Sequence, residues 1–281
     1  MSAPGPGPEA TGVRSADAGI DAAPRDAAPS IPVTGDVAWI HECFPERGGH
    51  LHVSVYLVRV PGGNILIDSG SFYHRDRLAD RIRRATAGEG IRSLILSHSD
   101  YPHSGNIPAL RGEWGDFEIV ASCADPEIQG LPYARRSRIG ETLEVLGRPF
   151  TFLDPPLADR SHTTWVYDET ARVLFVADGF GTLHPPGACD RFWGALPDVG
   201  RAEGVAEFHR QTLRWLEYVD PDRLLGTLER MFARHPVEAV APIHGPPIAA
   251  ADLDAYLGML GDAVRAIARR RPDHTGKDGD G

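Results

Sequence analysis

The feature that most constrains this chain is the stretch 94–105, in which an apolar run ends abruptly in side chains that bind metal ions. Residues 91–96 are mostly apolar, which predicts a buried strand. His98, Asp100 and His103 follow on the loop that leaves this strand, at the edge where open α/β sheets place their ligands. Imidazole and carboxylate groups this close together favour a bound cation. A polar loop that happens to hold two histidines is the alternative interpretation.

Composition limits the kind of protein that can carry this loop. The 281 residues are 42% hydrophobic and 24% charged, which is typical of a globular protein. The net charge of -10 argues against binding to nucleic acid or to an anionic membrane. The chain has no stretch of about 18 apolar residues, so no membrane span is predicted. The N-terminus also lacks the basic-then-apolar order of a signal peptide.

The number and spacing of the cysteines indicate the redox state of the compartment in which the protein works. Cys43, Cys123 and Cys189 are few, odd in number and far apart in the sequence. This spacing predicts neither a disulfide framework nor a zinc finger, and it favours a reducing compartment. We therefore expect a cytoplasmic protein.

The order of predicted elements indicates one α+β domain. Residues 1–34 are rich in Ala, Pro, Gly and Asp without apolar periodicity, which predicts a disordered tail, and residues 271–281 have the same character. Between them, in 35–270, hairpins are followed by βα units, more hairpins and then helices, which predicts two packed sheets covered by helices. Strands are expected at 36–44, 51–60, 65–68, 91–96, 117–121, 144–153 (one or two), 163–167, 172–177 and 237–242. Helices are expected at 74–87, 106–110, 125–129 (one turn), 205–234 (two, broken at Asp220) and 250–270.

Three more candidate ligands lie where predicted strands begin or end. His162 precedes one strand, Asp178 closes the apolar run 173–177, and His244 follows another strand and precedes Gly245. A single polar residue at such a place usually only starts a loop. Several such positions that all carry His or Asp are harder to explain in that way.

These motifs resemble those of the metallo-β-lactamase superfamily, whose αββα sandwich carries a His-x-His-x-Asp-His loop and then a His, an Asp and a last His. In closer detail, the motifs resemble those of the lactamase-like domain of flavodiiron and related oxygen-binding diiron proteins. The resemblance covers about residues 36–270. The matching segments are His98-Ser-Asp100-Tyr-Pro102-His103-Ser-Gly105, His162, Asp178-Gly-Phe-Gly181 and Pro242-Ile-His244-Gly-Pro246.

By this resemblance, His98, Asp100 and His162 would hold one metal ion. Asp100 stands where the hydrolases have His and the diiron relatives have Glu. An oxygen donor in that place favours a harder ion, iron or manganese, over zinc. The alternative for Asp100 is that its side chain caps a helix beside the loop proline.

The resemblance implies a second metal ion held by His103 and His244, with Asp178 as the bridging ligand. Pro102 stands where the superfamily has a carboxylate ligand, and proline has no side-chain donor. The second ion would then have three protein ligands and be weak, labile or missing. The same departure counts against simple hydrolysis. Asp178 and Asp100 are the candidate catalytic residues, and two iron ions, or else zinc or manganese, are the expected cofactors.

Other residues have less specific interpretations. Asp68, at the end of a strand, is expected to orient the histidine loop rather than to bind metal. Tyr101 and Trp193 are candidates for the pocket entrance, with a core position as the alternative for Trp193. Three histidines are candidates for the pocket wall, although ordinary strand or loop positions are favoured for them: His50, His52 and His184.

Three functions follow from these expectations. The first is a non-haem diiron enzyme that binds or activates dioxygen or reduces a small oxidant. No flavodoxin-like pattern follows residue 270, so a separate electron donor is expected. The second is a metal-dependent hydrolase of an ester, thioester, amide or phosphoester, because a metal lowers the pKa of its bound water towards about 7. The third is a non-catalytic metal-binding sensor. A small-molecule substrate is expected, a homodimer is compatible with these functions, and the oxidoreductase is favoured over the hydrolase.

Overall fold

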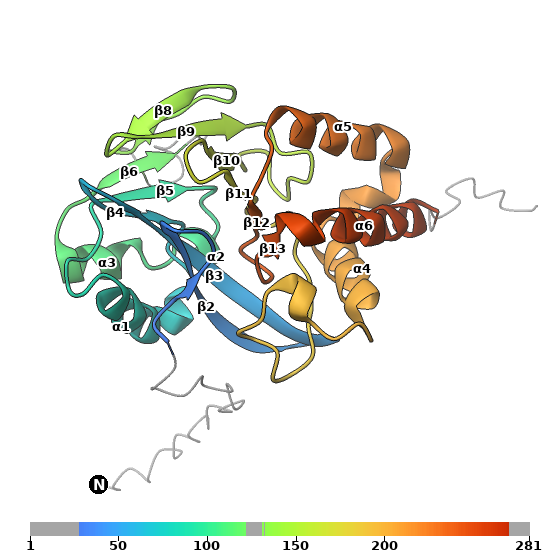
Figure 1. Ribbon diagram of the computed structural model, residues 1–281, viewed down its shortest axis with the longest axis horizontal. Helices are drawn as coiled ribbons and strands as arrows, with labels where there is room; N and C mark the ends of the chain where they lie inside the picture. Colours follow the sequence, from blue (N-terminus) through green and yellow to red (C-terminus); the bar gives the residue numbers. More distant parts are fainter. Residues whose placement is uncertain (1–27, 122–130, 132, 270–281) are drawn as a thin grey trace, which may run out of the picture.

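The computed structural model describes residues 28–121, 131 and 133–269. Two sheets face each other, and helices cover the outer face of each (Figure 1). This αββα sandwich confirms the predicted fold class. The apolar alternation along the hairpin strands produces it, because one face of each strand packs on the opposite sheet and the other on helices.

The first sheet is antiparallel at its beginning and parallel at its end. Strands β1 to β4 pair as antiparallel neighbours, whereas β4 to β7 run parallel. The short strand β5 is buried along its whole length, as expected of a parallel strand covered on both faces. The bounds are β1 Ile31–Pro32, β2 Val37–Glu46, β3 Gly49–Val60, β4 Gly63–Ile67, β5 Ser93–Leu96, β6 Glu118–Ala121 and β7 Arg135–Arg136.

The second sheet has the order β13-β12-β11-β10-β9-β8. Only the pair β11 and β12 is parallel, and the other described neighbours are antiparallel. The strands are short, and their loops lead towards the histidine loop of the first sheet. The bounds are β8 Thr142–Val145, β9 Arg148–Leu153, β10 Trp165–Asp168, β11 Val173–Phe175, β12 Ala239–Ala241 and β13 Ile248–Ala249.

Two groups of helices form the outer layers. Helices α1 and α3 cover the first sheet, and α4, α5 and α6 cover the second (Figure 1). Helix α5 begins where expected, because the Asp220 side chain accepts hydrogen bonds from the backbone N–H groups of Asp222 and Arg223. The bounds are α1 Arg75–Ala85, α2 Tyr101–Ser104, α3 Ile107–Trp114, α4 Arg201–Thr212, α5 Pro221–Arg234 and α6 Leu253–Ala268, with short 3₁₀ helices η1 Phe72–His74, η2 Trp193–Ala195, η3 Arg214–Tyr218 and η4 Ala250–Asp252.

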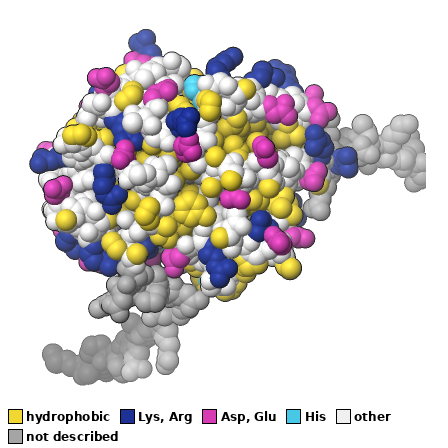
Figure 2. All heavy atoms as spheres, in the orientation of Figure 1, with side chains coloured by type: hydrophobic (Ala, Val, Ile, Leu, Met, Phe, Trp, Pro, Cys, Tyr) yellow, Lys and Arg dark blue, Asp and Glu magenta, His cyan; other side chains and the backbone are white. Residues whose placement is uncertain are grey.

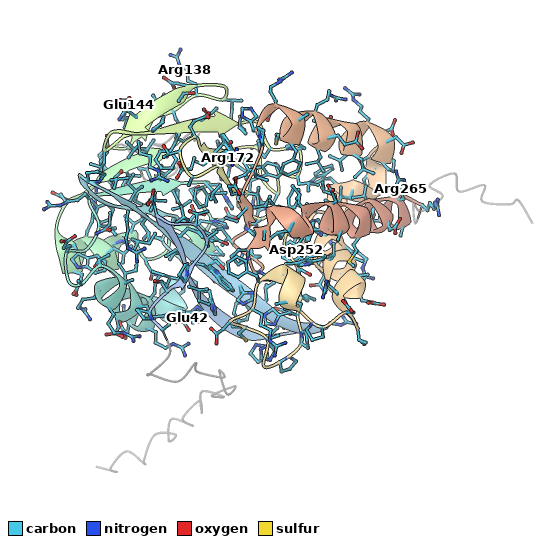
Figure 3. The ribbon with its side chains drawn as sticks, viewed as in Figure 1. Glu42, Arg138, Glu144, Arg172, Asp252 and Arg265 are labelled. Carbon is cyan, nitrogen blue, oxygen red and sulfur yellow. The ribbon has the colours of Figure 1, made fainter. Side chains whose placement is uncertain are left out.

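Apolar side chains fill three layers, one between the sheets and one under each group of helices. Trp39 and Tyr56 from the first sheet meet Phe150, Phe152 and Phe175 from the second. Truncation of such a buried aromatic side chain to Ala costs about 3–5 kcal/mol of stability. Side chains occupy the interior in Figure 3, and charged side chains of both signs are spread over the face in Figure 2. The rigid layers therefore present the strand ends as a fixed platform.

Some boundary predictions need correction. Ordered structure begins before residue 35, because β1 pairs with β2 through Ile31 and Trp39. The short elements β7, β13 and α2 were not predicted, since they are too brief to show periodicity. The predicted turn at 125–129, residues 1–27 and the C-terminal tail lie outside the described residues. Among the helices that the structure describes, none is long and apolar enough to cross a bilayer.

Candidate metal centre

The histidine loop is anchored by Asp68, at the carboxyl end of β4. Because β4 and β5 are parallel neighbours, their ends meet at one edge of the sheet. The Asp68 carboxylate accepts hydrogen bonds from the Ser97 backbone N–H and hydroxyl, both at 2.8 Å. The same carboxylate lies 2.8 Å from Nδ1 of His103. The expected orienting contact of Asp68 with the loop is therefore present.

His103 is buried between two carboxylates. Its Nδ1–H donates to Asp68, and its Nε2 lies 2.8 Å from Oδ1 of Asp178. Burial alone would lower the pKa of this ring, but the charges of Asp178 and Asp68 outweigh it and raise the pKa to about 10. The two carboxylates therefore favour a positive charge at this ring, which a proton or a bound cation can supply.

Asp178 lies between two histidines. Its Oδ1 is 3.4 Å from Nε2 of His244, whose Nδ1–H donates to the backbone carbonyl of His52 at 2.9 Å. Burial would raise the pKa of Asp178, but the nearby His244 and His103 hold it well below its usual range. The carboxylate is ionised, and the hydrogen bond to His52 leaves Nε2 of His244 facing it.

The glycines of the Asp-Gly-Phe-Gly motif are required by close packing. A Cβ atom on Gly181 would lie 2.1 Å from the Phe208 ring, and one on Gly179 would lie 2.7 Å from the Trp165 ring. No side chain fits at either position without displacing a buried aromatic ring. The two glycines thus let the backbone after β11 turn tightly and hold Asp178 towards the histidine loop.

His98 occupies the other end of the site. It is fully buried, its ring centroid lies 3.8 Å from that of His103, and its Nε2 has no hydrogen-bond partner within the described part of the chain. Burial, with the neighbouring His103, keeps its pKa well below the usual value, so the ring is neutral. Ligand atoms of His98, His103 and Asp178 all lie within 4.8 Å of one another.

Two predicted ligands lie at the outer edge of the site. Oδ2 of Asp100 accepts a hydrogen bond from Nε of Arg160 at 2.8 Å, and the Asp100 side chain is one third exposed. Asp100 occupies the N-cap position of α2, but its side chain makes no capping hydrogen bond, so the capping interpretation is wrong. His162 is half-buried, and its Nε2 lies 3.4 Å from the hydroxyl of Ser99.

Asp159 is a further candidate ligand that no motif indicated. Its side chain is only 7% exposed, its Oδ2 lies 3.6 Å from Nε2 of His98, and it accepts a hydrogen bond from Thr163 at 2.7 Å. Ligand atoms of Asp159, His98 and Asp100 lie within 4.8 Å of one another. The available signal was its place in the loop three residues before His162. Burial, assisted by the charge of Asp178, raises its pKa.

A cavity of about 600 Å³ opens onto Asp178 and His244. Its walls are largely apolar, with Phe44, Val53 and Phe208 among the lining side chains. As expected, Tyr101 lines it, together with Pro102 and Tyr73. Trp193 is instead buried in the core under α6, so its alternative interpretation holds.

His50, His52 and His184 are not among the residues that line this cavity. They lie together with Cys43 and Cys189, whose sulfur atoms are 2.8 Å apart. Cys43 and Cys189, which are far apart in the sequence, are therefore neighbours in the fold. Folding brings together residues that are almost 150 positions apart in the chain.

The sequence profile of the Metallo-beta-lactamase superfamily matches residues 48–187. A hydroxyacylglutathione hydrolase of Stenotrophomonas maltophilia is 29% identical over 142 residues, which are 50% of this chain and 49% of that protein. A coenzyme F420H(2) oxidase of Methanothermobacter marburgensis is 26% identical over 210 residues, 68% of this chain and 49% of that protein. A variant flavo di-iron protein of Thermotoga maritima superposes with a TM-score of 0.66 at 20% identity, covering 80% of this chain and 58% of that one.

The αββα sandwich and the histidine loop at its edge define the class of protein as one built on the metallo-β-lactamase fold. The profile match is to the same family, and the chain carries a Metallo-beta-lactamase superfamily domain. The chain spans about half the length of the curated relatives it matches. Its structural neighbours include flavodiiron proteins.

Proposed function

We propose that this protein is a non-haem diiron oxidoreductase that binds dioxygen or another small oxidant and reduces it. The observation that carries the proposal is the ionised Asp178 carboxylate held between His103 and His244, beside His98. A bridging carboxylate flanked by imidazoles is the donor set of a dinuclear centre, and carboxylate oxygen favours iron or manganese. In this proposal His103 and His244 hold one ion, and Asp178 is shared by both.

The buried donor atoms fit such a centre. Nε2 of His98 is buried with no hydrogen-bond partner in the described part of the protein, which is costly unless something else satisfies it. For the first ion, the proposal takes His98, His162 and a carboxylate. Asp159 is the better-placed carboxylate, because Asp100 is already paired with Arg160. Asp100 would join it only after Arg160 moves away.

The chain's own residues would prepare the site for this chemistry. Bound iron supplies a redox-active ion that can pass electrons to the oxidant. Asp68 fixes the proton on Nδ1 of His103, so that Nε2 faces the metal position. The apolar walls of the cavity admit a small uncharged oxidant and limit access of water to Asp178.

The electrons would come from a separate reduced carrier. A relative named coenzyme F420H(2) oxidase supports a reduced flavin-like or deazaflavin-like donor. The donor is oxidised, dioxygen is reduced, and the protons that form water come from the donor and from solvent. The small-molecule substrate and the donor are therefore the expected partners.

A metal-dependent hydrolase is the second candidate. The observation that favours it is the similarity to a protein named hydroxyacylglutathione hydrolase, combined with a cavity that ends at Asp178 and His244. Pro102, which lines the cavity, counts against it, because a proline cannot help to hold an attacking water. A sensor without catalytic activity is the remaining alternative.

Metal analysis of the full chain, purified without added ions, tests the proposal. We expect about two iron ions per chain, as in two-metal centres, with oxygen consumption when a chemically reduced flavin is supplied. Stoichiometric zinc with ester or thioester turnover would contradict diiron redox chemistry and support the hydrolase. A single metal, or none, without turnover of either kind would support the sensor.

A further inference from the structure

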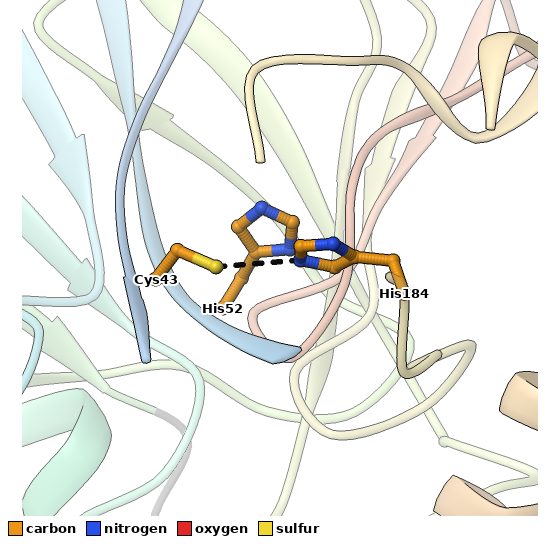
Figure 4. Close-up of side chains that lie close together, drawn as sticks. All are labelled: Cys43, His52 and His184. Carbon is orange, nitrogen blue, oxygen red and sulfur yellow. Dashed lines mark hydrogen bonds between the residues drawn. The ribbon is translucent and has the colours of Figure 1, made fainter. Parts of the chain in front are cut away.

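A second group of metal-binding side chains lies at the end of the β2–β3 hairpin, apart from the candidate centre. Cys43 on β2 stands opposite His52 on β3, and His50 lies two residues before His52 on the same face of that strand. The segment after β11 joins them, because His50 and His184 form a β-bridge with backbone hydrogen bonds of 2.7 and 3.0 Å. Figure 4 shows Cys43, His52 and His184 facing one another.

Three of the distances between donor atoms match those around a tetrahedral ion. Sγ of Cys43 lies 3.4 Å from Nε2 of His184 and 3.6 Å from Nδ1 of His50, and Sγ of Cys189 lies 3.8 Å from the same His50 nitrogen. Ligand atoms around tetrahedral zinc lie about 3.3–3.8 Å apart, given its Zn–S and Zn–N distances. Only the two sulfur atoms, at 2.8 Å, are closer, and a cation between them would hold them further apart.

The rings are oriented so that ring nitrogens remain free for a cation. Nδ1–H of His184 donates to the carbonyl of Pro185 at 3.0 Å, which leaves the Nε2 lone pair facing Cys43. His52 donates its Nε2–H to the carbonyl of Cys189 at 2.8 Å and stacks on His184 with a centroid distance of 4.4 Å. Nδ1 of His52 is then buried with no hydrogen-bond partner among residues 28–121, 131 and 133–269.

Two overlapping groups share Cys43 as their common member. Ligand atoms lie within 4.8 Å of one another in the group of Cys43, His50 and Cys189, and also in the group of Cys43, His52 and His184. Four of these five residues are buried, and Cys189 is partly buried. Thiolate and imidazole are the donors that zinc prefers in closed structural sites.

We propose that this protein holds a second metal ion, a zinc-type cation, bound by the thiolates of Cys43 and Cys189 and by two of the three imidazoles. Binding displaces the thiol protons to solvent and changes no oxidation state. The ion joins the β2–β3 hairpin to the segment 184–189. The ion also holds His52 in place, and the backbone carbonyl of His52 orients His244. The part of this inference that concerns His244 rests on the proposed function.

Cobalt substitution tests the site in the full chain. Reduced protein is stripped with a chelator, desalted and titrated with Co²⁺, because only thiolate ligands give intense sulfur-to-cobalt charge-transfer bands. We expect such bands in the wild-type protein and their displacement by Zn²⁺. The double variant Cys43→Ser/Cys189→Ser should abolish them. Cys43→Ser alone leaves one thiolate, and it should reduce the bands and weaken Zn²⁺ binding by more than about 100-fold, since even residues that only support a ligand cost about 10- to 100-fold.

Two control variants separate this site from the rest of the molecule. Cys123→Ser removes the third thiol of the chain and should leave the bands unchanged. His98→Ala disrupts the candidate diiron centre and should also leave them unchanged, so failure of the proposed function and failure of this inference give different results.

Three results would overturn the inference. The first is the absence of charge-transfer bands in the reduced wild-type protein. The second is bands that keep their full intensity in Cys43→Ser, or that survive Cys43→Ser/Cys189→Ser, in a variant whose circular dichroism matches the wild type. The third is a Cys43–Cys189 disulfide that persists in reductant, shown by the mass of the intact chain, because the sulfur atoms would then not be free to bind a metal ion.

Discussion

The candidate diiron centre and the Cys/His cluster use the same imidazole group with different partners. At the centre, His103 and His244 face the carboxylate of Asp178. At the cluster, His50 and His184 face the sulfur of Cys43. Oxygen donors favour a hard, redox-active ion, whereas thiolate donors favour zinc. The neighbours of the histidines, rather than the histidines themselves, therefore decide which ion each site selects.

The two regions also differ in access. The centre opens onto a cavity of about 600 Å³, as a site for an exchanging substrate requires. The cluster residues are not among those that line this cavity, and they are held by a β-bridge and by ring-to-carbonyl hydrogen bonds. An open site with carboxylates suits catalysis, and a closed site with thiolates suits a structural ion.

The largest expected effect is that of Asp178→Ala, which removes the only carboxylate lying between His103 and His244 among the described residues. Iron content should fall by at least about 100-fold, since both ions lose a ligand. Inductively coupled plasma mass spectrometry measures it. Asp154→Ala, at an exposed position, is the matched control and should keep full iron. A variant of Asp178 that retains its iron would show that the ligand assignment is wrong.

Zinc binding at the Cys/His cluster should increase the stability of the folded protein. In the Asp178→Ala background, Zn²⁺ at about 100 times its Kd should add about 2.7 kcal/mol to the free energy of unfolding. For a domain of this size that raises Tm by about 5–10 °C. Scanning calorimetry of the reduced protein measures the shift. Adding Cys43→Ser to the Asp178→Ala protein should abolish this shift in Tm. An equal shift in that double variant would contradict zinc binding at the cluster.

Asp68→Asn tests how strongly a residue that touches no metal controls the centre. The amide keeps the shape of the side chain but removes the charge that holds Nδ1–H of His103. Metal affinity at the centre should fall by about 10- to 100-fold, while the cobalt–thiolate bands of the cluster stay unchanged. Iron titration followed by optical absorption measures the first quantity. Loss of both signals together would indicate general misfolding instead.

The predictability of the two sites differs for a physical reason. His98, Asp178 and His244 follow strands of the two sheets, which marked each of them as a candidate ligand, and the resemblance to the superfamily motifs joined them into one predicted centre. The fold class followed from the order of the predicted strands and helices, together with the resemblance to the superfamily. The Cys43–Cys189 contact joins a hairpin to a distant loop, and no local period records such a pairing. Nothing in the spacing of these residues distinguished them from isolated side chains.

The role of Asp159 was harder to predict than the histidine motif but easier than the Cys43–Cys189 contact. Asp159 lies beside the predicted centre but was not among the predicted ligands, because it lies in a loop without periodicity and only the fold brings its carboxylate to 3.6 Å from His98. The sequence drew attention to Asp100 instead, because Asp100 stands inside the histidine motif. The structure shows that this carboxylate is paired with Arg160. A residue inside a motif is therefore not always the one best placed to bind.

The smallest expected effect separates these two carboxylates. Asp159→Asn should lower iron affinity at the first site by about tenfold, whereas Asp100→Asn should change it by less, because Asp100 is one third exposed and neutralised by Arg160. Arg160→Ala should sharpen the comparison, because it frees Asp100 to bind iron. The loss of iron affinity caused by Asp159→Asn should therefore be smaller in the Arg160→Ala background. Iron competition against a calibrated chelator measures all three variants. An effect of Asp100→Asn that exceeds that of Asp159→Asn would return the ligand role to the motif residue and leave Asp159 as a neighbour that only shapes the field around His98.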